Sequence, residues 1–144
     1  MNYKKLSIAA LLLLLFQGCV SKNLSDGDVI VKAMTSCPKG SDVSIITIPS
    51  RGVLADTLMA ASVKTTHNDG GFLREFVQQI EVGSKNIAVQ SSSEQKLEAI
   101  VANALSGIKD GKLKGISLCL IGISKSEELV SQATRTGATL IMHK

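Results

Sequence analysis

The sequence predicts an α/β fold, a small three-layer sandwich with a mostly parallel sheet of about four strands, after an N-terminal signal helix and a flexible tether. Two observations lead to this prediction. Short apolar runs alternate with longer segments whose apolar residues recur every three or four positions, as strands and helices alternate in parallel α/β folds. The run ISLCLIGI is apolar almost throughout, as expected of a strand covered on both faces.

Four segments have the character of strands. The first, Val43–Ile48, is rich in β-branched residues and ends at Pro49, which has no amide hydrogen to donate to a neighbouring strand. The others cover residues 85–90, 116–123 and 139–143. Helices are expected between these last three strands, so we expect right-handed crossovers and a parallel sheet.

Four helices are expected in the same domain, over residues 53–63, 73–80, 91–108 and 124–136. The third is the most regular, because its apolar residues share one face. Ser91 and Glu94 have the spacing of a capping box, in which the serine accepts a hydrogen bond from a backbone amide and the glutamate reaches back. Ser124 and Glu127 repeat this spacing before the fourth helix.

The N-terminal segment has the features of an export signal. Lys4 and Lys5 precede an uncharged run over residues 6–16, which is too short to cross a bilayer as a helix. The next residues, Phe16-Gln17-Gly18-Cys19, resemble the lipobox of bacterial lipoproteins. The resemblance implies that Cys19 becomes the first mature residue and carries three acyl chains. An ordinary secreted protein and an uncleaved anchor are the alternatives.

This resemblance sets the expected domain boundaries and location. Residues 1–18 are expected as the signal peptide, 19–42 as the lipidated cysteine and tether, and 43–144 as the α/β domain. The apolar patch at 29–31 leaves an edge strand or a helical turn open within the tether. Val20 follows the cysteine in place of an aspartate, so by resemblance to enteric lipoproteins we expect the outer membrane, with the protein facing the periplasm. The inner membrane is the alternative.

Composition weighs against nucleic acids and sugars as ligands. The chain has 16 Lys and Arg against 12 Asp and Glu, and two of the lysines belong to the signal peptide. Single-stranded nucleic acids stack on aromatic side chains, yet only Phe72 and Phe76 among the aromatic residues lie beyond the signal peptide. We therefore expect no nucleic-acid partner.

Lipidation of Cys19 leaves Cys37 and Cys119 as the only intrachain pair of cysteines. A disulfide between them would close a long loop and contribute on the order of 4 kcal/mol in the chain-entropy account. The alternative is that Cys119 is a small buried hydrophobic residue within its apolar run. There is no CxxC motif and no cluster of Cys with His, so we expect neither a metal site nor another cofactor.

Polar residues follow three of the predicted strands. Arg51, Ser92 and Lys125 lie just after the first, second and third strands, and the carboxyl ends of parallel strands meet at one edge of the sheet. A helix is expected to start near each of them, and the free amides of a helix N-terminus attract anions. The three residues are therefore candidates for binding a small anion or a nucleotide-like ligand. Plain helix capping by serine is the alternative.

The sequence lacks the familiar catalytic motifs. GxSxG, GxxxxGK[ST] and GxGxxG do not occur, and His67, His143, Asp56 and Asp69 are expected at the surface. The predicted function is a non-enzymatic, membrane-anchored lipoprotein that acts as a protein-interaction or assembly module of the cell envelope, for example in a secretion, conjugation or pilus system. Its expected partners are the membrane and an envelope protein. The alternative is a domain that binds a small ligand at the carboxyl edge of the sheet.

Overall fold

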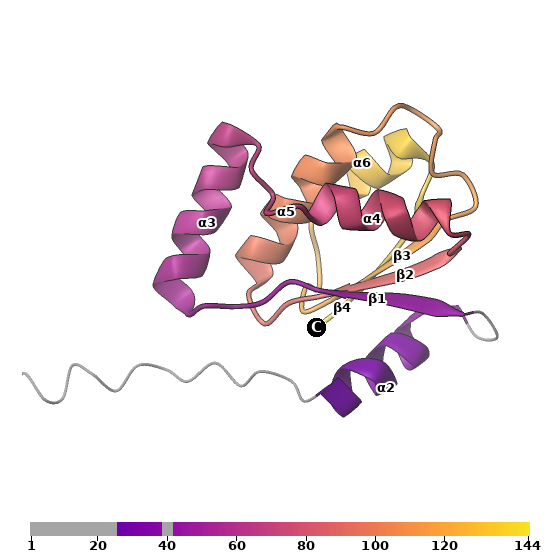
Figure 1. The fold of residues 1–144 in the computed structure, drawn as a ribbon, viewed down its shortest axis with the longest axis horizontal. Helices are drawn as coiled ribbons and strands as arrows, with labels where there is room; N and C mark the ends of the chain where they lie inside the picture. Colours follow the sequence, from indigo (N-terminus) through magenta and orange to yellow (C-terminus); the bar gives the residue numbers. More distant parts are fainter. Residues whose placement is uncertain (1–25, 39–41) are drawn as a thin grey trace, which may run out of the picture.

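A parallel sheet of four strands forms the centre of the computed structural model, which describes residues 26–38 and 42–144 (Figure 1). The strands are β1 (Val43–Thr47), β2 (Asn86–Gln90), β3 (Ser117–Ile121) and β4 (Thr139–His143). Their order in the sheet is their order in the chain, and each neighbouring pair is parallel. The predicted α/β fold is confirmed. The predicted signal peptide, Cys19 and the start of the predicted tether lie outside the described residues.

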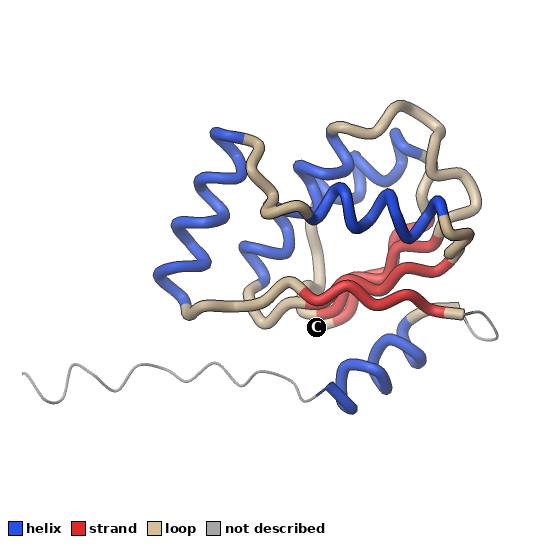
Figure 2. The backbone as a smooth tube through the Cα atoms, viewed as in Figure 1, coloured by secondary structure: helices blue, strands red, loops and turns tan. Residues whose placement is uncertain are grey.

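Helices cover both faces of this sheet. They are α2 (Asp26–Ser36), α3 (Val53–Thr66), α4 (Phe72–Glu81), α5 (Glu94–Ser106) and α6 (Glu127–Thr136). Helices α4, α5 and α6 lie on one face and α2 lies on the other, which gives the predicted three layers (Figures 1 and 2). Helix α3 stands beside the sandwich and packs mainly against α5. In the described part of the chain, no helix combines the length and the apolar character needed to cross a membrane.

The strand order explains why the crossover helices share one face. Parallel strands joined by right-handed crossovers place each connecting helix on the same side when each new strand is added at the same edge. Side chains alternate along each strand, so every strand also presents residues to the opposite face. Those facing the crossover helices include Ile46, Ile87, Val89, Leu118 and Leu120, whereas Ile45, Ala88, Cys119 and Ile121 face α2.

Residues 26–36 are expected in a tether, yet they form α2. Val29, Ala33 and Cys37 recur every four residues and are buried against the sheet. The patch at 29–31 therefore belongs to a helix and not to an edge strand. The physical reason is that the connecting helices leave one apolar face of the sheet open, and a short amphipathic segment before β1 covers it.

A disulfide links α2 to the sheet. The structure joins Cys37, just after α2, to Cys119 in the middle of β3, with the two Cα atoms 5.8 Å apart. Both cysteines are buried. The bond spans 82 residues of sequence, and a crosslink that closes so long a loop removes much conformational freedom from the unfolded chain.

Helices α5 and α6 begin later than the capping boxes predict. The caps are Ser93, which accepts a hydrogen bond from the Lys96 amide, and Ser126, which accepts one from the Leu129 amide. Each cap therefore lies two residues after the serine that was expected to cap the helix. Ser91 is still held beside β3, since its amide donates to the Ile121 carbonyl.

Candidate functional site

The three predicted ligand-binding residues follow neighbouring strands but do not surround one cavity. Arg51 lines a cavity between β1, α3, α4 and α5, whereas Ser92 lines a separate hollow at the start of α3 and α5. Lys125 is highly exposed, and its ammonium lies 3.9 Å from the carboxylate of Glu127. The strand order does not reverse anywhere in the sheet, so the topological crevice that usually gathers such residues is not formed.

The hollow beside Ser92 has an acidic lining. Carboxylates of Asp56, Glu94 and Glu98 contribute to it, and its other lining residues are neutral. Negative charge in a hollow repels anions. This hollow therefore does not suit a phosphate or carboxylate ligand.

The cavity beside Arg51 has an apolar floor and a charged mouth. Its volume is about 400 Å³, within the range of small-molecule sites, roughly 300–1,000 Å³. Arg51, Asp69 and Glu75 contribute charged side chains, and Lys96 lines the interior. The apolar lining includes Ile46, Ile48, Met59, Phe72 and Ile100. Of the hollows described here, this one combines apolar and polar groups as ligand sites do.

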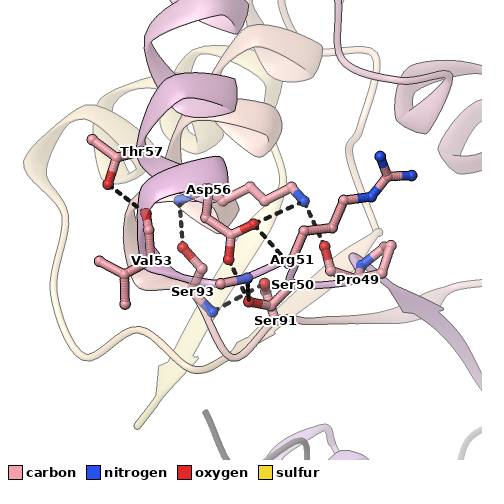
Figure 3. A network of polar contacts seen from close by, with 10 residues as sticks. Pro49, Ser50, Arg51, Val53, Asp56, Thr57, Ser91 and Ser93 are labelled. Carbon is pink, nitrogen blue, oxygen red and sulfur yellow. Dashed lines mark hydrogen bonds and ion pairs between the residues drawn. The ribbon is translucent and has the colours of Figure 1, made fainter. Parts of the chain in front are cut away.

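A buried ion pair forms one wall of this cavity. Lys96 is 6% exposed and Asp56 is 2% exposed, and the Lys96 ammonium lies 3.3 Å from Oδ1 of Asp56. The same ammonium donates to the Pro49 carbonyl. The Ser50 hydroxyl donates to Oδ2 of Asp56, and the Arg51 amide donates to Oδ1 over 3.1 Å (Figure 3). The pair thus joins the segment after β1 to the first turns of α3 and α5.

These contacts set the ionisation of Asp56. Burial alone would raise the pKa of the carboxyl group. The hydrogen bonds from the Ser50 hydroxyl, the Arg51 amide and the Lys96 ammonium, together with the charge of Lys96, outweigh burial and hold the pKa below its ordinary value. Asp56 is therefore ionised at neutral pH and acts as the counter-charge of Lys96.

The expectation that Asp56 lies at the surface is wrong, because the carboxylate is buried and accepts hydrogen bonds from three donors, the Ser50 hydroxyl, the Arg51 amide and the Lys96 ammonium. Helical spacing carries a signal for both partners of the pair. Asp56 is in phase with the buried Ala60 and Val63 of α3, and Lys96 is one turn before the buried Ile100 of α5. A charged residue on the buried side of each of two helices indicates an internal ion pair.

Asp69 serves a local structural role at the mouth of the cavity. Its Oδ1 accepts a hydrogen bond from the Gly71 amide over 2.9 Å, and its Oδ2 accepts one from the Leu73 amide over 3.0 Å. The carboxylate therefore satisfies amides at the start of α4, where its negative charge also favours the helix dipole. His67, as predicted, is exposed, and its Nδ1 lies 2.7 Å from Oδ1 of Asn103.

Comparison with protein families, with curated proteins and with solved structures finds no match to this chain. Over residues 26–38 and 42–144, no group of three or more His, Cys, Asp or Glu side chains is placed to hold a metal ion. The function is therefore inferred from the chain's own residues.

We expect the Asp56–Lys96 pair to be strongly coupled. Asp56→Asn or Lys96→Met alone should lower the free energy of unfolding by about 3–5 kcal/mol, because each leaves one charge buried without its partner. The double variant should lose clearly less than the sum of the two. Urea unfolding of the four proteins measures the coupling, with the exposed Lys125–Glu127 pair as the control cycle. Additive losses at Asp56 and Lys96 would contradict it.

The same pair predicts that the folded protein loses stability as the pH falls. Because the pKa of Asp56 is lower in the folded protein than in the unfolded chain, its contribution is present at neutral pH and is lost as the pH falls below about 4. In Asp56→Asn this part of the acid sensitivity should be missing.

Proposed function

We propose that this protein is a non-enzymatic bacterial lipoprotein, anchored in the outer membrane and facing the periplasm, that acts as a protein-interaction or assembly module of the cell envelope. The observation that carries the proposal is the order of features at the N-terminus: two lysines, an apolar run too short to span a bilayer, and Phe16-Gln17-Gly18-Cys19. Acylation with more than one chain would hold the protein stably at a membrane.

The Cys37–Cys119 disulfide supports export. Disulfides persist in oxidising compartments such as the bacterial periplasm and are rare in the cytosol. Both cysteines are buried in the same small cluster between α2 and the sheet. A structural crosslink in this position agrees with a domain that folds outside the cytosol.

An apolar stripe on α3 supports interaction with a protein. We define this stripe as Leu54 and Leu58, whose exposed fractions are 76% and 63%. The opposite side of α3 is occupied, since Ala60 and Val63 are buried against the rest of the domain. Apolar side chains at successive turns of an exposed helix face are a common mode of docking between proteins.

The anchor is tested by changing the cysteine. Cys19→Ser removes the thiol that would be acylated, so we expect unprocessed precursor and no lipid on the protein. Mass spectrometry of the mature N-terminus and labelling with a radioactive fatty acid measure the outcome. If Cys19→Ser is still cleaved and released from the membrane, the lipoprotein proposal is wrong.

The partner is tested by site-specific crosslinking in intact cells. A photoreactive residue at Leu58 should capture a defined envelope protein, and the exposed Lys112 serves as the matched position away from the α3 stripe. Leu54→Asp should weaken the capture, because a charge within the stripe opposes apolar docking. Recovery of the same abundant proteins from both positions would count against a specific partner.

A small-ligand function is the second candidate, and the cavity beside Arg51 favours it. The cavity has an apolar interior, and Arg51 lies among its charged lining residues together with the carboxylates of Asp69 and Glu75. Asp69 accepts hydrogen bonds from the amides at the start of α4 and Lys96 is paired with Asp56, so among these lining residues Arg51 is the cation left for an anionic group. Its occupant would place an anionic or polar group near Arg51 and an apolar part against the floor. Lys125, which the sequence groups with Arg51, is highly exposed and pairs with Glu127.

Thermal unfolding tests this second function. If the cavity binds anions, phosphate or a nucleotide should raise the unfolding temperature, since a ligand of the folded state stabilises it. Arg51→Ala should abolish the shift, and Lys125→Ala should keep it. The absence of any shift across phosphate, acetate and nucleotides would contradict an anion site.

A further inference from the structure

We propose that the outward face of α2 rests on the membrane surface in the anchored protein. This inference depends on the proposed lipid anchor at Cys19. The outward face of α2 is defined here as Ile30, Val31 and Met34. Its occupant is the headgroup and upper acyl region of a phospholipid bilayer.

The first observation is that these three large apolar side chains are exposed. Ile30, Val31 and Met34 are 48%, 61% and 65% exposed. The helix has only 11 residues, and its other side already packs on the sheet through Val29 and Ala33. Asp28 and Thr35 are exposed on the same helix, so the outward side of α2 mixes polar residues with these three large apolar ones. A surface helix normally turns polar residues to solvent, so three large exposed apolar side chains on so short a helix indicate contact with something apolar.

The second observation is the distance along the chain from the proposed anchor. Asp26, the first residue of α2, lies seven residues after Cys19. A chain of that length reaches at most about 25 Å even when fully extended. The acyl chains therefore keep α2 close to the bilayer surface, and this proximity raises the effective concentration of lipid at its outward face.

The third observation is the placement of α2 in the fold. It forms the outer layer on one face of the sheet, whereas α3, α4, α5 and α6 lie toward the other side (Figure 1). The disulfide from Cys37 to Cys119 fastens this layer to β3. A bilayer in contact with α2 would therefore orient the whole domain, with α3 beside the sandwich and outside the layer that α2 forms (Figure 1).

Interfacial helices bury their apolar side about 5–10 Å into the boundary between headgroups and acyl chains. Three side chains on a short helix make a weak contact by themselves. With the acyl chains already inserted, the contact has only to favour one orientation of the domain over the others. The contact of α2 with lipid would thus be a second attachment to the membrane, in addition to the acyl chains on Cys19.

The composition of the chain provides a direct test. There is no tryptophan in the sequence, so a single introduced tryptophan is a unique fluorophore. Val31→Trp places it on α2, and Leu58→Trp is the matched control on α3, since the two side chains are 61% and 63% exposed. The lipidated full chain is reconstituted into vesicles of phosphatidylethanolamine and phosphatidylglycerol with brominated acyl chains.

We expect the emission of Val31→Trp to shift to the blue and to be quenched by the brominated lipid, and that of Leu58→Trp to be unchanged. Adding Met34→Asp to Val31→Trp should reduce the quenching. Met34→Trp repeats the measurement independently, and cooperative unfolding shows that each variant is folded.

Three results would overturn the inference. The first is that the protein floats with the vesicles but neither tryptophan is quenched. The second is that Leu58→Trp is quenched and Val31→Trp is not. The third is that the emission of Val31→Trp shifts to the blue without quenching, which means that protein and not lipid covers α2. In each of these cases, acylation of Cys19 and flotation of the protein with the vesicles would still support the proposed lipid anchor. If mass spectrometry finds no lipid on Cys19 and the protein does not float, the proposed function fails, and the inference fails with it.

Discussion

The handedness of the crossovers is the constraint on which the rest of this structure depends. Strands added in chain order at one edge, each through a right-handed connection, place α4, α5 and α6 on a single face. The second face still carries apolar residues such as Ile45, Ala88 and Ile121. It must be covered from elsewhere, and the segment before β1 does so. Because the crossover helices occupy one face only, α2 is needed to cover the other. The disulfide holds α2 there, on the side of the sheet that the segment before β1 can reach.

Polar contacts after the end of β1 position α3, which does not pack on the sheet. Helix α3 leaves the sandwich and rests mainly on α5. The Asp56–Lys96 pair joins the start of α3 to the start of α5, and the Ser50 hydroxyl, the Arg51 amide and the Pro49 carbonyl hydrogen-bond to it. Charges enclosed in this way stabilise a fold only while both partners are present. The same arrangement leaves the cavity beside Arg51 between α3 and the sheet.

Local pattern was enough to predict the four strands and the four helices that follow β1, because each has a periodicity of its own. Helix α2 could not be assigned this way. Its buried residues, Val29 and Ala33, with Cys37 just after the helix, are recognised only when an uncovered sheet face is known. Asp56 and Lys96 lie on the buried sides of their helices, at helical spacing from Ala60 and Ile100, so the helical periodicity of the sequence already indicated a buried ion pair. Grouping Arg51, Ser92 and Lys125 required knowledge of the strand order, which local patterns do not contain.

The link between α2 and β3 also bears on the order of folding. A chain is made from its N-terminus, so Cys37 appears 82 residues before its partner. Until β3 has paired with β2, α2 has no complete surface to pack on, and the thiol of Cys37 remains free to react with other thiols or disulfides. The bond can form only when β3 has come beside α2, so an oxidised pair marks a chain in which segments 82 residues apart have already met.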